Sequence, residues 1–256
     1  MKRITFIIAS LICISFSALS NAQNSNQTAK DVYLVPNPET AKWSYIQSDE
    51  NGKPTSTSYY SIESLTGDGV NGLVKMLVEE VFVDPSVETT KDHVFYRFKD
   101  GEYMLDMDAI LESDALKDAT QSAIDEEGLE LTEEQMKEVY ETIKQELNIS
   151  GEVRGIPRYP QVGKLPDFEF RFKVFIANVK MSGEKRRIVG TERIETNGGT
   201  FDCFVMEETL VTKAMLMKEV EKTKSWFAYG IGLVKEITYD KNDKVISTVI
   251  LNEINW

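Results

Sequence analysis

Hydrophobic and polar residues alternate one by one along much of this 256-residue chain. The clearest case is the segment 168–176, where Phe168, Phe170 and Phe172 fall on one face and charged residues fall on the other. Antiparallel strands with one buried face require this alternation, and helical packing would not produce it. A first strand begins at Trp43, and the same pattern predicts strands over 73–83, 94–98, 103–107, 188–194, 201–207, 233–239 and 245–254.

Short turn sequences separate these predicted strands. Asp100-Gly101 links two apolar segments, and this pair is favoured in tight hairpins whose central residues need positive φ. Further reversals are predicted at 49–52, 182–183, 197–199 and 241–244. Closely spaced reversals join strands that are neighbours in sequence, and the strands do not alternate with helices. We therefore predict a mainly β fold, an antiparallel meander that forms a strongly curved open barrel or half-barrel, in a single domain over 41–256.

A helical hairpin is predicted to interrupt the sheet at about 107–147. Thr132 and Gln135 fit a capping box, in which each side chain bonds to the backbone N–H of the other. A weaker helix is predicted over 108–124, and Gly128 is suited to end it. We expect the hairpin to cover the concave face of the sheet. Residues 213–224 fit a strand or a helix, and a strand is favoured. The apolar residues that recur at helical spacing after the capping box are Met136, Val139, Tyr140, Ile143 and Leu147.

The N-terminus has the pattern of a secretory signal. Lys2 and Arg3 precede an apolar run over 4–19, and a small-x-small site ends at Ala22, after which cleavage is expected. The apolar run is short for a permanent membrane span. We expect a signal peptide over 1–22 and a flexible leader over 23–40. The protein is then periplasmic or secreted, with no integral membrane span after cleavage.

Cysteine usage and charge narrow the possible functions. Ile12 precedes Cys13 where a lipid-attachment site would have a small residue, so the chain is not expected to be a lipoprotein. Cys203 is then alone in the mature chain and can form no internal disulfide. The net charge of −13 argues against nucleic acid and anionic membrane surfaces as partners. Thirteen acidic and three basic residues between Met107 and Leu147 concentrate this charge in the helical hairpin.

Several motifs carry a family resemblance. The segments 162–167, 199–203 and 226–235 read VGKLPD, GTFDC and WFAYGIGLVK, and Trp43-Ser44-Tyr45 followed by Asn51-Gly52-Lys53 fits a first hairpin. Together they resemble the TapB-like family of exported bacterial proteins. The resemblance implies a bacterial envelope location and a β-rich domain, and it supplies no activity and no catalytic residue.

The sequence offers few candidates for catalysis. His93 is the only histidine, so any Ser–His or Cys–His pair would need it, and a solvated or hydrogen-bonded strand histidine is favoured. Cys203 lies on an apolar strand face, which favours inert packing. Acidic pairs such as Glu133/Glu134 could serve a glycosidase or bind calcium, but a solvated helix face is favoured. Lys185-Arg186-Arg187, beside a predicted turn, is interpreted as a hairpin edge that discourages aggregation. We predict no catalytic residue, metal or cofactor.

Aromatic residues give the best candidates for binding. Gly230 and Gly232 beside Trp226 mark a bulge or a close backbone approach, and the rings there line a pocket mouth or pack at a barrel corner. The preferred hypothesis is a non-catalytic module that binds a lipid or another apolar or amphipathic molecule on the concave face. The alternatives are an envelope assembly subunit whose acidic hairpin binds a protein partner and, third, a hydrolase that uses carboxylates. The predicted ligand-binding residues are Trp226, Phe227, Tyr229, Phe168, Phe170, Phe172, Met136 and Tyr140.

Overall fold

The computed structural model describes residues 34–36, 40–67, 71–107, 109, 131–146, 148–174, 177–214 and 217–256. The predicted signal peptide, most of the predicted leader and nearly all of the predicted first helix lie outside these residues. The described elements are β1 (Lys42–Asp49), β2 (Pro54–Gly67), β3 (Gly72–Phe82), β4 (Thr90–Lys99), β5 (Glu102–Leu105), α4 (Glu133–Glu146), β6 (Asn148–Glu152), β7 (Ile156–Pro157), β8 (Gly163–Lys164), β9 (Phe168–Val174), β10 (Ala177–Thr196), β11 (Gly199–Ala214), β12 (Met217–Ala228), β13 (Gly232–Tyr239) and β14 (Val245–Asn255).

The strands form one antiparallel sheet. Its order is β6-β9-β10-β11-β12-β13-β14-β1-β2-β3-β4-β5-β7, and β8 pairs with β10. Strands β9–β14 and β1–β5 each follow their order in the chain, and the pairing of β14 with β1 joins these two halves. The predicted antiparallel meander is therefore confirmed, and the sheet is open rather than closed. Residues 217–224 belong to β12, as the favoured interpretation expected.

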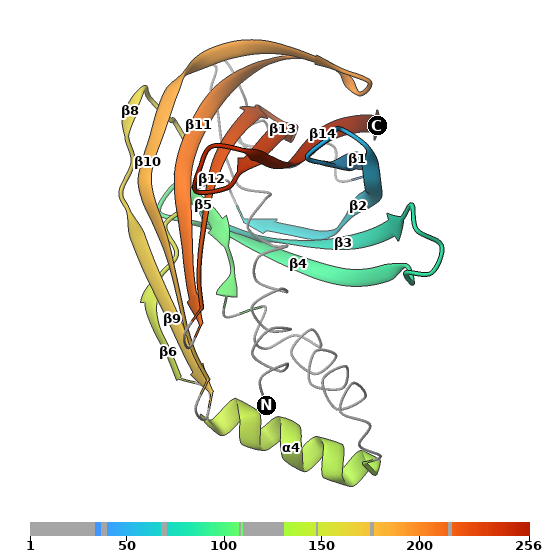
Figure 1. Ribbon diagram of the computed structural model, residues 1–256, viewed down its shortest axis with the longest axis vertical. Helices are drawn as coiled ribbons and strands as arrows, with labels where there is room; N and C mark the ends of the chain where they lie inside the picture. Colours follow the sequence, from blue (N-terminus) through green and yellow to red (C-terminus); the bar gives the residue numbers. More distant parts are fainter. Residues whose placement is uncertain are drawn as a thin grey trace.

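The sheet is strongly curved, so that its two halves face each other. In Figure 1 the long strands β9–β12 run along one wall, and β2–β4 run across them. Strands β10 and β5 are separated by nine strand pairings, about 43 Å along a flat sheet. Yet Arg186 Nη2 of β10 donates to the carbonyl of Gly155 at 3.0 Å, and the next residue, Ile156, pairs with Tyr103 of β5. The two halves of the sheet therefore approach each other, which confirms the predicted half-barrel.

One short segment links the two ends of the open sheet. From the edge strand β6, which pairs with β9, the chain passes to β7, which pairs with β5. It then reaches β8, which returns to pair with β10. Ion pairs accompany this crossover: Lys99 Nζ lies 2.9 Å from Glu152 Oε1, and Arg154 Nη2 lies 2.7 Å from Glu102 Oε1. The crossover thus holds the half-barrel in its curved shape.

The predicted reversal at Ser182-Gly183 is wrong, because β10 continues without interruption from Ala177 to Thr196. Gly183 serves packing instead: a Cβ atom at this position would lie 2.2 Å from Cε1 of the Phe168 ring. A glycine required by a neighbouring ring looks the same in sequence as a glycine required by a turn. The chain bends within β10 by bulges, the first of which lies between Glu184 and Arg187.

Other local predictions are confirmed. Asp100 and Gly101 have φ of 53° and 77° in the β4–β5 hairpin. The capping box before α4 is formed, since the Thr132 N–H donates to Gln135 Oε1 at 2.9 Å and the Gln135 N–H donates to Thr132 Oγ1 at 3.3 Å. Helix α4 lies near the end of β9, away from the bend of the sheet (Figure 1).

Aromatic side chains dominate the inner face of the sheet. Phe170 of β9 and Phe227 of β12 lie there, with 2% and 0% of their surfaces exposed. From the opposite wall, Tyr96 and Tyr103 stack with their ring centroids 4.9 Å apart, and Tyr45 donates a hydrogen bond to the carbonyl of Leu233 at 2.9 Å. The inner face is therefore a packed core in the part of the chain that the structure describes.

Candidate functional site

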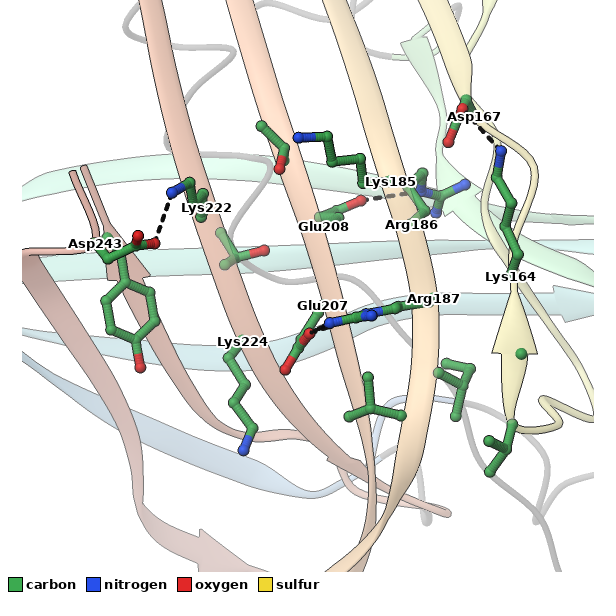
Figure 2. A pocket seen from close by; sticks show the side chains of 17 residues that line it. Lys164, Asp167, Lys185, Arg186, Arg187, Glu207, Glu208, Lys222, Lys224 and Asp243 are labelled. Atoms are coloured by element: carbon green, nitrogen blue, oxygen red, sulfur yellow. Dashed lines mark hydrogen bonds and ion pairs between the residues drawn. The ribbon is translucent and has the colours of Figure 1, made fainter. Parts of the chain in front are cut away.

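A groove of about 1210 Å³ lies on the outer face of the sheet, opposite the phenylalanines of β9. Its floor is formed by β10, β11 and β12. The segment 162–167, which includes β8, forms one wall, and Tyr239 and Asp243 of the β13–β14 hairpin form the other. Figure 2 shows these walls on either side of the long strands, with charged side chains pointing into the space between them.

Strand register sets the outward residues of the groove floor. Arg187 of β10 pairs with Glu207 of β11, which pairs in turn with Lys224 of β12, so the three side chains form one row across the sheet. In the next row, Thr209 of β11 pairs with Lys222 of β12. Side chains two apart along a strand share a face, so both rows point outward into the groove.

The bulge in β10 divides three consecutive cations between the two faces. Lys185 has a φ of 56° and is exposed, Arg186 is 1% exposed, and Arg187 is exposed again. The interpretation of these residues as a hairpin edge is wrong, because they lie in the middle of β10 and the buried Arg186 anchors the fold. Sequence reasoning missed this because the bulge, which decides the orientation of each side chain, leaves no signal in the alternation pattern.

Arg186 fixes a groove wall from the inner side. Its Nε lies 2.9 Å from Glu208 Oε2, its Nη1 donates to the carbonyl of Pro166 at 2.9 Å, and its Nη2 donates to the carbonyl of Gly155 at 3.0 Å. Burial raises the pKa of Glu208, and the neighbouring guanidinium opposes that shift. A single buried guanidinium therefore holds both the crossover after β6 and the chain just after β8.

Cations outnumber anions among the outward side chains of the groove. The ion pairs drawn in Figure 2 include Arg187–Glu207 at 2.6 Å, Lys222–Asp243 at 2.6 Å and Lys164–Asp167 at 3.4 Å. Lys185 and Lys224 complete the lining, and Lys224 is paired with Glu192 at 3.2 Å, outside the groove. The outward lining therefore has five cations against three anions. This excess stands out in a chain whose net charge is −13.

Trp226 adjoins one end of the groove. Lys224 and Lys235 place their ammonium groups 4.7 and 5.1 Å from its ring centroid. Its indole N–H donates to Glu192 Oε2 at 2.7 Å, and this bond is the main cause that lowers the pKa of Glu192. The ring is thus held between two lysines beside the groove floor.

The structure does not bring the eight predicted ligand-binding residues together. Phe168, Phe170, Phe172 and Phe227 lie on the inner face with 0–7% of their surfaces exposed. Trp226 lies on the outer face, and Tyr229 is half-buried in the turn after β12. Met136 and Tyr140 are half-buried on α4.

The other candidate residues are positioned as structural groups. His93 Nε2 lies 3.2 Å from Glu63 Oε2 at the surface. Within the described ranges, no group of three or more His, Cys, Asp or Glu residues is placed to hold a metal ion. Glu236 is a buried carboxyl on the inner face, where Ser225 Oγ donates to it at 2.7 Å and burial raises its pKa to about 8.

Cys203 is expected to be unreactive in the folded protein. It is 1% exposed, and burial is the main cause that raises the pKa of its thiol to about 12. A disulfide reagent such as Ellman's reagent should react at least about 100-fold more slowly with the native protein than with the urea-unfolded chain. Equal rates would contradict this placement.

Comparisons with known proteins agree with the architecture. The fold is that of the YmcC-like proteins. A Bacteroides fragilis protein inferred to be exported, with a YmcC-like fold, matches with a TM-score of 0.56 at 16% identity, over 87% of this chain and 98% of its own. A Parabacteroides distasonis protein inferred to be a lipoprotein matches with a TM-score of 0.57 at 18% identity, over the same shares. The chain belongs to the DUF3108-like family, a family of unknown function whose profile matches residues 39–251.

The comparisons confirm only part of the family resemblance seen in the sequence. A search of the curated proteins finds no match. They confirm that the chain belongs to a family of unknown function and that one structural neighbour is inferred to be exported. They do not confirm the TapB-like name. Because one neighbour is described as a lipoprotein, the expectation that this chain has no lipid anchor gains no support. No helix in the described part of the chain is long and apolar enough to cross a membrane.

Proposed function

We propose that this protein is a non-catalytic binding protein of the bacterial cell envelope and that the groove over β10, β11 and β12 is its ligand site. The observation that carries the proposal is the groove itself, a space of about 1210 Å³ open to solvent and lined by charged side chains. An open groove with fixed walls suits a ligand that is bound and released. The ion pairs of the groove are exposed, so its charged side chains can exchange their partners for groups of a ligand.

The inner face is the weaker candidate for the ligand. Phe168, Phe170 and Phe172 would form its wall, but 7% or less of each side chain is exposed. A ligand there would have to displace packed protein, whereas a ligand in the groove displaces water. The sequence predicts an apolar or amphipathic ligand. Of these two, an amphipathic ligand whose polar part binds in the groove agrees better with the structure.

A binding role also agrees with the state of the reactive side chains. Glu207 and Asp243 already form ion pairs with Arg187 and Lys222. Cys203 is buried beneath the outer surface. These features support a protein that binds without catalysis.

Filling the groove tests the site. Thr209 is half-buried at the centre of the floor, and Thr57 is half-buried on the outer face of β2, in the other half of the sheet. We expect Thr209→Trp to lower the amount of ligand that co-purifies from the host envelope by at least about tenfold, because the indole occupies the binding space. Thr57→Trp should have no effect. Native mass spectrometry measures the retained ligand, and equal retention by Thr209→Trp and the wild type would refute the proposal.

A further inference from the structure

We propose that the groove binds an anionic group, a phosphate or a carboxylate, above Thr209 and between Lys185 and Lys222. This inference rests on the groove being the ligand site, and it names the chemistry that the site selects. It is carried by a comparison of two adjacent rows of side chains on the groove floor.

The first row has its own anion on the central strand. Glu207 stands on the central strand β11 between Arg187 on β10 and Lys224 on β12. The carboxylate of Glu207 lies 2.6 Å from Arg187 Nη2. The protein therefore places one of its own anions between two cations at this level of the groove.

The second row has a neutral residue on its central strand, and its acidic residue, Glu184, lies on β10 instead. Thr209 takes the central position, Lys222 is its register partner on β12, and Lys185 projects from the bulge on β10. Strands β10 and β12 are about 10 Å apart across β11, and the long flexible stems of two lysines can converge over that distance. A ligand anion above Thr209 would occupy the position that Glu207 occupies one row away.

The neighbouring charges leave this position available. Lys185 forms no ion pair within the part of the chain that the structure describes. Glu184, the register partner of Thr209 on β10, does not line the groove, and its Oε1 accepts a hydrogen bond from Ser182 Oγ at 3.1 Å. Lys222 is paired with Asp243, but 75% of the Asp243 side chain is exposed, and such a pair costs little to exchange. The Thr209 hydroxyl can donate to the bound anion.

A single substitution can give the second row the central carboxylate that Glu207 supplies in the first row. Thr209→Glu places a carboxylate between Lys185 and Lys222 and should abolish anion binding while keeping the groove open. Thr57→Glu adds the same charge on the outer face of β2 and is the matched control. Lys185→Gln removes one cation and should weaken binding without adding a negative charge.

The test is titration of the full-length protein with inorganic phosphate, followed by NMR, at low and at high salt. We expect saturable binding to the wild type that weakens as salt rises, and at least about tenfold weaker binding to Thr209→Glu, with Thr57→Glu unchanged. Co-sedimentation with phosphatidylglycerol vesicles, against phosphatidylcholine vesicles, tests the same anion presented as a lipid headgroup. Binding of either probe that Thr209→Glu abolishes supports the inference. Binding of neither probe, or equal binding by Thr209→Glu, overturns it.

The two proposals fail in different ways. If Thr209→Trp loses its co-purified ligand but Thr209→Glu retains it, the groove is the ligand site and the anion position is wrong. If both variants retain the ligand, the groove is not the site.

Discussion

Replacing Arg186 with alanine is expected to lower the free energy of unfolding by about 3–5 kcal/mol, because it leaves a buried charge without its partner. Glu208 lies with only 9% of its side chain exposed and would lose the guanidinium 2.9 Å away. The carbonyls of Gly155 and Pro166 would lose their donor as well. Urea unfolding followed by circular dichroism measures the change.

The adjacent residue provides the control. Arg187 is paired with Glu207, but 60% of its side chain is exposed. Arg187→Ala should therefore cost less than about 1 kcal/mol. Similar losses for the two variants would show that Arg186 does not anchor the crossover. Replacing both partners, as Arg186→Met with Glu208→Leu, should recover much of the stability, because no buried charge is then left alone.

Replacing Glu236 with glutamine is expected to remove a large part of the pH dependence of stability. Burial raises the pKa of Glu236 from 4.5 to about 8 in the folded protein. Between these values the folded state holds a proton that the unfolded state has released, so the free energy of unfolding falls as pH rises. The fall is about 1.4 kcal/mol per pH unit, or about 2–3 kcal/mol between pH 5 and pH 7.

Urea unfolding of the wild type and Glu236→Gln at pH 5, 6, 7 and 8 measures this dependence. The glutamine variant should be the more stable protein at pH 7 and should show a flatter curve. Ser225, which donates to the carboxyl at 2.7 Å, can bond equally to the amide. Glu253→Gln changes an exposed carboxyl of β14 and should keep the wild-type slope. An unchanged slope in Glu236→Gln would contradict the burial of an acid at this position.

Local patterns predicted most of the sheet. The alternation at Phe168, Phe170 and Phe172 identified β9 and its buried face, and Asp100-Gly101 identified a hairpin. Ser182-Gly183 was misread because a glycine can serve a neighbouring ring as well as a turn, and only the register of β9 against β10 distinguishes the two. Alternation determines which residues share a face, but not what covers that face.

The candidate site was harder to predict because it exists only through strand register. Lys185, Thr209 and Lys222 come from three strands and meet only when β10, β11 and β12 pair in one alignment, with a bulge in β10. The net charge of −13 also concealed a groove with excess positive charge, because composition averages over the whole surface. The aromatic residues were the more prominent signal, and most of them form the core.

Lysine acetylation footprinting of the protein with its envelope ligand bound, and again after the ligand is removed, tests the groove most directly. Lys185, Lys222 and Lys224 should react at least about fivefold more slowly with the ligand present, while the exposed Lys53 should react equally in both states. Protection that spares the groove lysines and falls instead on Lys137 of α4 would contradict a ligand site over β10, β11 and β12.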